Sequence, residues 1–570
     1  MNINIKPETV QRVILLVVIF MIPLFYFFGI LSVDTNPFVR IAFMLASSCA
    51  WIFIFEEKKW RRNQGFEKLF MIMGLQTLFL YIFQQIHFIN DYPLSQSWSE
   101  TSHYYYASTF FAERIYGKSL MLPYIKQSMY MVLSLPFLIP DVNLFSLRLW
   151  ERTLVIIIPI LTSYFIIRRV SFSRRTNKYI FFIWCTLFLL QGPIYYHLLF
   201  IPIIFFILYR SGKVLRTSIL VFFLSVWTGL SRINWYPVPG TLAALMFYLK
   251  VERDGRSFKS VAKYHTLPAF WLVLSMGTSF LSMYFYQGVS NVDPRLLGSA
   301  LYSKLLWYRL FPNPTFKPGI LIGSLAVSGV VLFFIGKNLK KRNWSNSRKI
   351  AIVGIIAVFL LGGLIVSVKI GGGADLHNMD IYLMLIAVLF IFLYFGKEKA
   401  GKEIDFLLQT RYKHLWIFLL YVPVIYISAN VPPLPELDYQ TAADTIQTMQ
   451  EEVNFYNDQG EDVLLATQHH LYTFDIISDV IQDPFYEKTL MMEVAISENK
   501  SLIQKYRNDM EEGKYPVIIS DALFPGHKNR YESSFAEEQY YYAEYIADTI
   551  RKHYQEVMNL PGNIYIFESK

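Results

Sequence analysis

The sequence predicts a mostly α-helical fold, in which a polytopic bundle of transmembrane helices is followed by a small α/β domain outside the membrane. Hydrophobic residues make up 54% of the 570 residues and charged residues only 17%, against about 25% charged residues in ordinary soluble domains. The apolar residues form long runs up to residue 430, and the composition becomes that of a soluble protein beyond it. These observations exclude a disordered chain and predict two domains, residues 1–430 and 431–570.

The apolar runs predict about thirteen membrane-spanning helices, because a span needs about 20 mostly apolar residues. We expect these helices at 13–33, 38–55, 69–89, 146–167, 179–191, 195–209, 217–231, 239–250, 266–286, 318–336, 350–368, 381–396 and 415–430. The first run is longer than the apolar core of a signal peptide and has no small-residue cleavage site. We therefore expect it to be retained as the first span.

Clusters of lysine and arginine follow every second predicted span. They lie within 58–62, 168–178, 210–216, 250–259, 337–349 and 397–413, in a chain with a net charge of +10. The positive-inside rule places such clusters in the cytoplasm. This predicts a cytoplasmic N-terminus and, with an odd number of spans, a C-terminal domain outside. We expect a multi-pass protein of the plasma (inner) membrane whose partners include membrane lipids and no nucleic acid.

The C-terminal domain shows short apolar runs separated by helical patterns. Strands are expected at 462–467, 515–521 and 563–569, and a long helix at 535–558. Strands that alternate with helices favour a small α/β domain with a largely parallel sheet. No glycine-rich phosphate loop follows a strand, so we expect no nucleotide site there. His469 and His470 are adjacent and would point to opposite faces of a strand, which argues against a metal pair.

The polar, irregular connectors of the membrane domain all fall on the predicted outer side. The main ones are 90–117, 191–197, 231–240, 287–314 and 369–380, and the first belongs to an outer loop at 90–140. Irregular backbone at membrane depth is tolerated only where it lines a cavity or packs on protein. The set therefore predicts a shared site on the outer face, although an ordinary turn would explain any one connector equally well.

The first outer loop carries the candidate catalytic acids, Glu100 and Asp91. If the loop is helical here, Glu100, His103 and Tyr104 share one face. A carboxylate at the membrane rim can act as a general base when it reaches the proton of an acceptor. Without further context, an exposed carboxylate on an interfacial helix is the simpler interpretation.

The order of features around Glu100 supplies that context. The acid is followed by Tyr-Tyr-Tyr-Ala-Ser at 104–108, a Tyr-Gly turn at 116–117, two Leu-Pro pairs and a helix that opens near Arg148-Leu149. This order resembles the first outer loop of the GT-C superfamily of polytopic glycosyltransferases. Many members read Asp-Glu-x-x-Tyr where this sequence reads Ser99-Glu100-Thr-Ser-His-Tyr, and two additional predicted helices precede the loop here.

The resemblance implies a reaction. A polyprenyl-phosphate-linked sugar would be the donor, and a lipid or glycan of the cell envelope would be the acceptor. The acid would deprotonate an acceptor hydroxyl, which attacks the anomeric carbon, usually with inversion. The superfamily has metal-dependent and metal-independent members, so a divalent metal is possible, although the sequence assigns no metal ligand and no other cofactor.

A leaving phosphate needs cations or amide donors, and several lie at predicted outer helix ends. The candidate phosphate-binding and substrate-binding residues are His103, Arg148, Arg232, Arg295, Arg309 and Lys369, together with Asp375, His377 and Asn378 after Gly371-Gly372-Gly373. The glycine amides could approach an anion closely. For each cation the alternative is a snorkelling side chain that marks a helix end.

Two other classes of function remain open at this point. A transporter or lipid flippase would need a polar path across the bilayer, yet the predicted spans hold few charges and show no inverted repeat. A non-catalytic scaffold for envelope assembly would use the outer domain as its interaction module. The glycosyltransferase hypothesis differs from both in requiring one outward-facing pocket built around a carboxylate.

Overall fold

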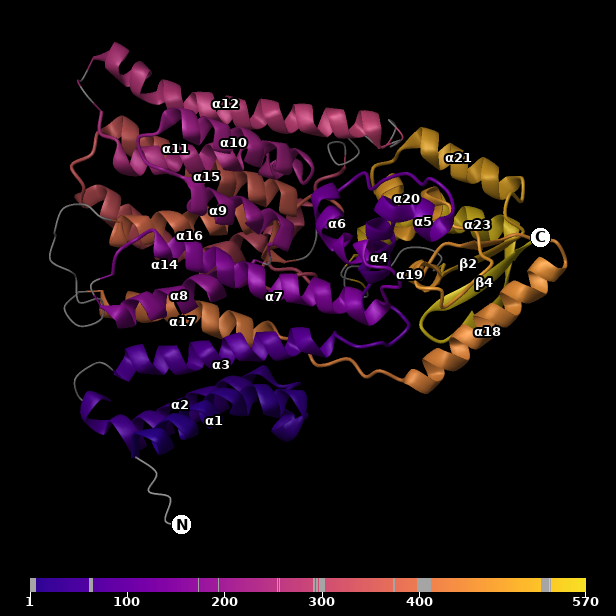
Figure 1. Ribbon diagram of the computed structural model, residues 1–570, viewed down its shortest axis with the longest axis horizontal. Helices are drawn as coiled ribbons and strands as arrows, with labels where there is room; N and C mark the ends of the chain where they lie inside the picture. The colour runs from indigo at the N-terminus through magenta and orange to yellow at the C-terminus, as the bar shows by residue number, and fades with distance from the viewer. Residues whose placement is uncertain are drawn as a thin grey trace.

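The fold is described from a computed structural model. It describes residues 7–60, 65–172, 174–192, 194–253, 255, 257–290, 293, 296, 303–372, 375–396, 412–523, 533 and 535–570. Most helices of the first 430 residues run along the longest axis of the molecule, and the C-terminal domain caps one end of the bundle (Figure 1). The predicted mostly helical chain with a small sheet near its C-terminus is confirmed.

Eight described helices are long and apolar enough to cross a membrane. They are α1 (Pro7–Phe27), α2 (Pro37–Trp60), α3 (Gly65–His87), α7 (Leu144–Arg168), α12 (Phe258–Val289), α14 (Ile320–Lys341), α15 (Asn346–Ser367) and α16 (Asp380–Phe395), the last together with the preceding η7 (Leu376–Met379). Five other predicted spans also coincide with helices, which are α8 (Arg175–Leu190), α9 (Tyr196–Leu208), α10 (Val214–Gly229), α11 (Val238–Lys250) and α17 (Lys413–Asn430). Helices pair their backbone groups internally, as a lipid solvent requires.

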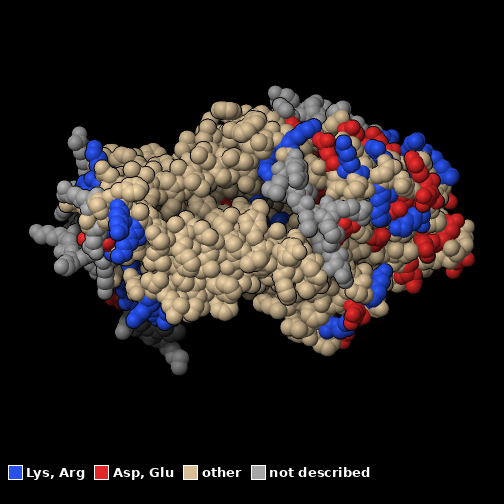
Figure 2. Space-filling view, turned by 90° about the horizontal axis from the view of Figure 1, so that it is seen from above, with Lys and Arg blue, Asp and Glu red and all other residues tan. Residues whose placement is uncertain are grey.

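The surface of the bundle divides along the same axis. Figure 2 shows a middle zone almost without charged residues on the visible face, with lysine and arginine at one end and both signs of charge over the C-terminal domain. Large apolar side chains are exposed along the helices of the bundle, such as Val273 and Leu281 on α12, each at 71%. In water these exposed side chains would be costly, so the pattern is that of a membrane protein.

Close helix packing in the interior depends on small residues. A Cβ atom at Gly229 of α10 would lie 2.4 Å from Ser279 O of α12, and one at Gly240 of α11 would lie 2.3 Å from Trp271 O. Thr228 and Ser279 also share a hydrogen bond of 2.7 Å between α10 and α12. Small residues that let helix backbones approach are typical of membrane bundles. They position the end of α10 and the start of α11, which lie before and after Arg232 in the chain.

The segment between α3 and α7, which is the predicted outer loop, is folded. It contains α4 (Glu100–Ser108), η2 (Thr109–Phe111), α5 (Ala112–Tyr116), α6 (Gln127–Leu133) and η3 (Leu135–Leu138). Gly117 has a φ of 64° where the chain turns after α5, a conformation that glycine adopts at little cost. Asn143 caps α7 by accepting a hydrogen bond from Ser146 N. The loop therefore packs as a small helical layer between the bundle and the C-terminal domain.

The C-terminal domain contains a four-stranded sheet with the order β1-β2-β4-β3. Its elements are α18 (Tyr439–Asp458), β1 (Val463–Leu465), α19 (His470–Thr473), η8 (Pro484–Tyr486), α20 (Lys488–Ile496), α21 (Lys500–Glu511), β2 (Val517–Asp521), α22 (Ala536–Tyr542), η9 (Ala543–Ala547), α23 (Asp548–His553), β3 (Tyr554–Leu560) and β4 (Ile564–Ser569). The predicted strands coincide with β1, β2 and β4. The prediction of a largely parallel sheet is wrong, because two of the three strand pairs in the described sheet, β2–β4 and β3–β4, are antiparallel.

The long helix predicted at 535–558 is also wrong at its end. The helical segment stops at His553, and the next residues form β3, which pairs with β4 in an antiparallel hairpin. The turn uses Gly562 and Asn563, with φ values of 78° and 62°, the residue types that tolerate the left-handed region. This turn makes the final strand antiparallel, as a tight hairpin must. His469 and His470 lie at the start of α19 instead of on a strand.

Two buried carboxylates attach the C-terminal domain to the rest of the chain. Glu487 accepts a hydrogen bond of 2.8 Å from the Tyr106 hydroxyl of α4 and another from Ser102. Glu538 accepts two bonds from Arg309 Nη2, at 2.9 and 3.1 Å. Because these acids are almost completely buried, each bond to them is charge-assisted in a low-dielectric setting. The domain is thereby held over the outer loop.

Candidate active site

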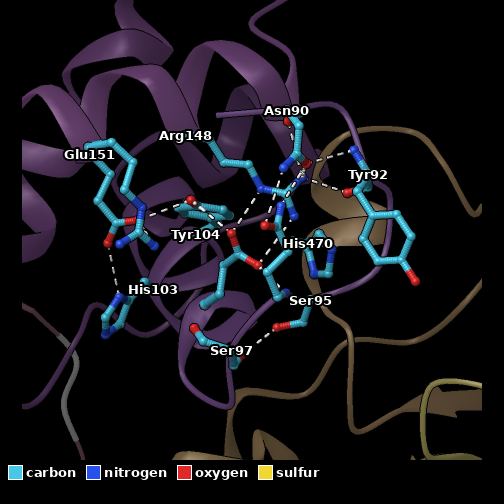
Figure 3. Close-up of polar contacts among 12 residues, drawn as sticks. Asn90, Tyr92, Ser95, Ser97, His103, Tyr104, Arg148, Glu151 and His470 are labelled. Atoms are coloured by element: carbon cyan, nitrogen blue, oxygen red, sulfur yellow. Dashed lines mark hydrogen bonds and ion pairs between the residues drawn. The ribbon is translucent and has the colours of Figure 1, made fainter. Parts of the chain in front are cut away.

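The outer loop and the start of α7 meet in a buried ion pair of Glu100 and Arg148. Arg148 Nε lies 2.9 Å from Glu100 Oε1, and Arg148 Nη2 lies 3.2 Å from Oε2. The other guanidinium bonds go to Asn90 and to the carbonyl oxygens of Tyr92 and Leu94, and Figure 3 shows Arg148 enclosed by this loop. The side chains of the pair are 0% and 1% exposed. We call Asn90, Glu100 and Arg148 the arginine cluster.

Glu100 accepts two more hydrogen bonds beside those from Arg148. Gln96 N donates to Oε2 at 2.6 Å, and the Tyr104 hydroxyl donates to Oε1 at 3.2 Å. A carboxylate offers about four lone-pair sites, so the donors around Glu100 fill them. The role of Glu100 as a general base stays a prediction, and so does that of Asp91, which is exposed and interacts with Tyr439 at the start of α18.

His103 lies at the edge of the same region and pairs with Glu151 of α7. His103 Nδ1 is 3.3 Å from Glu151 Oε1, and the other carboxylate oxygen accepts a bond of 3.0 Å from Tyr104 (Figure 3). The His103 side chain is 16% exposed, against 8% for Glu151. We call His103 and Glu151 the histidine–glutamate pair. Sequence reasoning did not single out Glu151, since it lies within an apolar span.

The second polar region is built from the connector after α10 and from η7. Arg232 donates through Nη2 to Asn378 Oδ1, and its Nη1 lies 3.9 Å from Asp380 Oδ2. That Asp380 oxygen is already bonded to Trp235 Nε1 at 2.8 Å. Arg232 Nη1 is buried and makes no hydrogen bond to the described residues. The guanidinium therefore has one donor that no described residue uses in a hydrogen bond.

Lys126 and Tyr195 bring a second cation to Arg232. Lys126 Nζ donates to the Tyr195 hydroxyl at 3.1 Å, and the guanidinium of Arg232 lies 5.8 Å from the centre of the Tyr195 ring. The charge of Lys126, together with those of His377 and Arg232, outweighs burial and lowers the pKa of the Tyr195 hydroxyl to about 7. All four side chains are partly exposed. We call Lys126, Tyr195, Arg232 and His377 the cationic cluster.

Carboxylates only partly balance the cationic cluster. His377 Nδ1 lies 2.6 Å from Asp375 Oδ1. Partial desolvation raises the pKa of Asp375, but the bond from His377 outweighs it and brings that pKa below the usual value. Lys126 forms no ion pair with any residue the structure describes. The starts of α6, α9 and α16 and the end of α10 thus meet at a partly open site, in which Lys126 has no carboxylate partner among the described residues. Lys126 and Tyr195 were absent from the predicted set, because a lone lysine and an aromatic pair in loops carry no pattern.

The other predicted phosphate-binding residues lie outside the cationic cluster. Arg148 and Arg309 each face a buried carboxylate. Lys369 interacts with Glu493 of α20, which opposes the lowering of its pKa by burial. Arg295 lies outside the described residues. Gly371 N, in the glycine run expected to approach an anion, donates to Glu538 at 2.8 Å. The glycine amide therefore meets an anion, and that anion belongs to the C-terminal domain.

A separate cavity of about 350 Å³ lies between the outer loop and the end of α12. Its lining is mixed and includes Phe111, Glu113, Arg114, Leu120 and Ser290. Within the described part of the chain, no group of three or more His, Cys, Asp or Glu side chains could hold a metal ion.

Compared with known proteins, the chain matches no protein-family model and no curated protein sequence. Because function resides in the site and not in the fold, we infer the function from the chemistry of the cationic cluster and its neighbours.

Proposed function

We propose that the protein is an integral-membrane glycosyltransferase that moves a sugar from a polyprenyl-phosphate-linked donor to an envelope acceptor. The observation that carries the proposal is the cationic cluster. Lys126 and Arg232 both approach the partly exposed Tyr195, Lys126 forms no ion pair with a described residue, and Arg232 Nη1 makes no hydrogen bond to one. Such a site suits a phosphate that carries charge in the reactant and gains more as it leaves.

The position of the cationic cluster supports a lipid-linked donor. Its residues follow or precede apolar helices, at the boundary between the helix bundle and the outer loop. A phosphate held here would leave its polyprenyl chain beside the helices, where lipid provides the solvent. A donor with a built-in phosphate also requires no nucleotide, in agreement with the missing phosphate loop. This is the donor class that the resemblance to the GT-C superfamily implies.

The proposal includes a topology of thirteen spans with a cytoplasmic N-terminus. All thirteen expected segments are helical, and lysine and arginine gather at the end of the molecule opposite the C-terminal domain (Figure 2). The positive-inside rule then puts that end in the cytoplasm. The C-terminal domain and the cationic cluster would face outward, from the plasma (inner) membrane.

The test uses the full chain in lipid nanodiscs and two matched lipids. A polyprenyl phosphate and the corresponding polyprenol differ only in the phosphate, so the ratio of their affinities reports phosphate recognition. We expect the phosphate to bind at least tenfold more tightly, and Lys126→Met to remove most of that preference. Lys126→Met is a suitable variant because no buried acid loses its partner. Lys118→Met, at an exposed cation of the same loop, is the matched control.

Activity is then measured with a panel of polyprenyl-phosphate-linked sugars, by release of polyprenyl phosphate in the presence of envelope lipid and glycan extracts. Release that depends on Lys126 would support the proposal. Equal binding of the polyprenol and its phosphate would overturn it. Movement of the lipid across the bilayer without sugar release would favour a flippase instead.

A further inference from the structure

In the histidine–glutamate pair, a fixed carboxylate supports a partly exposed imidazole, an arrangement that the buried acid Glu100 lacks. Glu151 is fixed on both oxygens, by His103 Nδ1 at 3.3 Å and by the Tyr104 hydroxyl at 3.0 Å. The imidazole is the more exposed partner, at 16%. The Glu151 carboxylate is thus held in place, and the His103 ring is partly exposed at the surface of the protein.

The bond to Glu151 sets which ring nitrogen can accept a proton. A carboxylate beside Nδ1 favours the tautomer with hydrogen on Nδ1, which leaves a lone pair on Nε2. Nε2 of His103 has no hydrogen-bond partner among the described residues. Glu100, in contrast, accepts four hydrogen bonds and is 2% exposed. The available basic lone pair therefore belongs to His103.

His103 also lies near the cationic cluster. Its ring centre is 6.0 Å from that of Tyr130 on α6, and Tyr130 N donates to the carbonyl oxygen of Lys126, one turn earlier, at 3.4 Å. The start of α9 contacts the same helix, because the hydroxyl of Tyr196, next to Tyr195, donates to Met129 O at 3.2 Å. His103 and the cationic cluster therefore both adjoin the short helix α6.

We propose that His103 is the general base of the transfer and that Glu151 positions it. This inference rests on the proposed function. Nε2 of His103 takes the proton of the acceptor hydroxyl while the acceptor oxygen forms a bond to the anomeric carbon. The bond between that carbon and the phosphate oxygen breaks, and the electron pair leaves with the polyprenyl phosphate toward Lys126 and Arg232. Charge and atoms balance without an oxidant, reductant or metal.

The experiment compares three variants of the full chain in nanodiscs. His103→Asn keeps a donor for Glu151 and removes the Nε2 base, so we expect normal thermal unfolding, unchanged binding of polyprenyl phosphate and at least about a 100-fold loss of turnover. His103→Ala should be equally inactive, and added imidazole should restore part of its turnover. Glu151→Gln should lower kcat more than it changes KM, because it acts through His103. His87→Ala, at a histidine bonded to Pro435 O, is the control for imidazole.

The outcomes separate the two proposals. Loss of turnover in His103→Asn with phosphate binding intact supports His103 as the base. Turnover near that of the parent in His103→Asn overturns the base assignment and leaves the glycosyltransferase proposal intact. A His103→Ala variant that imidazole cannot restore also counts against a chemical role. Failure of the parent chain to distinguish polyprenyl phosphate from polyprenol removes the proposed function itself.

Discussion

The arginine cluster and the cationic cluster use the same types of residue in opposite ways. Arg148 is 0% exposed and is bonded to a carboxylate, an amide and three carbonyl groups. Arg232 is 17% exposed, and its buried Nη1 lies 3.9 Å from the Asp380 carboxylate and makes no hydrogen bond to any described residue. The donors of Arg148 are thus occupied by protein groups, whereas Arg232 has a donor that no described residue uses in a hydrogen bond.

The comparison shows that an arginine beside an acid is not by itself a site. Burying a charge is costly unless hydrogen bonds compensate it, so a fully bonded cation stabilises structure and has little left for a ligand. A buried cation with incomplete hydrogen bonding is not fully compensated for its lost hydration, and an anionic ligand could supply the missing bonds. Completeness of hydrogen bonding therefore distinguishes the two clusters better than residue type or position.

The largest expected effect comes from Arg148→Met, which leaves the Glu100 carboxylate buried without its cation. Loss of one partner of a buried ion pair costs about 3–5 kcal/mol, so we expect a lower free energy of unfolding by that amount in detergent micelles. Adding Glu100→Gln to this variant should recover part of the loss. A change below about 1 kcal/mol would contradict the structural role of the arginine cluster.

The second-largest expected effect is a pH dependence of the free energy of unfolding, which comes from His470 beside the arginine cluster. Its Nε2 lies 2.7 Å from Pro93 O, and burial lowers its pKa to about 4. The folded state thus favours neutral His470, and its contribution is complete above pH 6.5. Below pH 6.5 the unfolded chain takes up the proton first, so stability falls toward pH 4 by up to about 1.4 kcal/mol per pH unit.

His470→Gln isolates this contribution, because glutamine can still donate to the Pro93 carbonyl but does not titrate. We expect denaturant unfolding of this variant to depend less steeply on pH between 6.5 and 4 than that of the parent chain. Parallel pH profiles would show that water reaches this cluster and would weaken the contrast with the cationic cluster.

The cationic cluster should titrate near neutrality instead. With a pKa of about 7, Tyr195 becomes a phenolate as the pH rises, which partly neutralises Lys126 and repels an anion. We expect the affinity for a polyprenyl phosphodiester, whose own charge is constant in this range, to fall up to about tenfold between pH 6 and 8, or about 1.4 kcal/mol. Tyr195→Phe should flatten this profile, and an unchanged profile in that variant would refute the assignment.

The membrane part of the fold could be predicted because each helix is encoded locally. A run of apolar residues is both the signal for a span and its physical cause, so every predicted span coincides with a helix. β3 was missed because its sequence, Tyr554–Leu560, continues a helical pattern, and the hairpin with β4 decides its conformation. The choice between helix and strand there is made by tertiary contacts.

The candidate site was less predictable, since pairing between distant residues decides it. Glu100 and Arg148 were both selected as functional, yet the sequence does not reveal that they bond to each other across 48 positions. Arg309 and Gly371 were similarly expected to meet a phosphate, and both meet Glu538. Arg232, His377 and Asn378 were predicted from clustering of polar residues at helix ends, which is a local signal.

The smallest expected effect is that of Arg232→Lys, which keeps the charge and changes its shape. Lysine has no planar fork of donors, so it cannot hold Asn378 and also present the free nitrogen that Arg232 Nη1 provides. We expect polyprenyl phosphate to bind about fivefold more weakly, or roughly 1 kcal/mol, with thermal unfolding unchanged. If the cluster worked by charge alone, Arg232→Lys would bind like the parent chain while Lys126→Met would not, and the incomplete bonding of Arg232 would then be incidental to phosphate recognition.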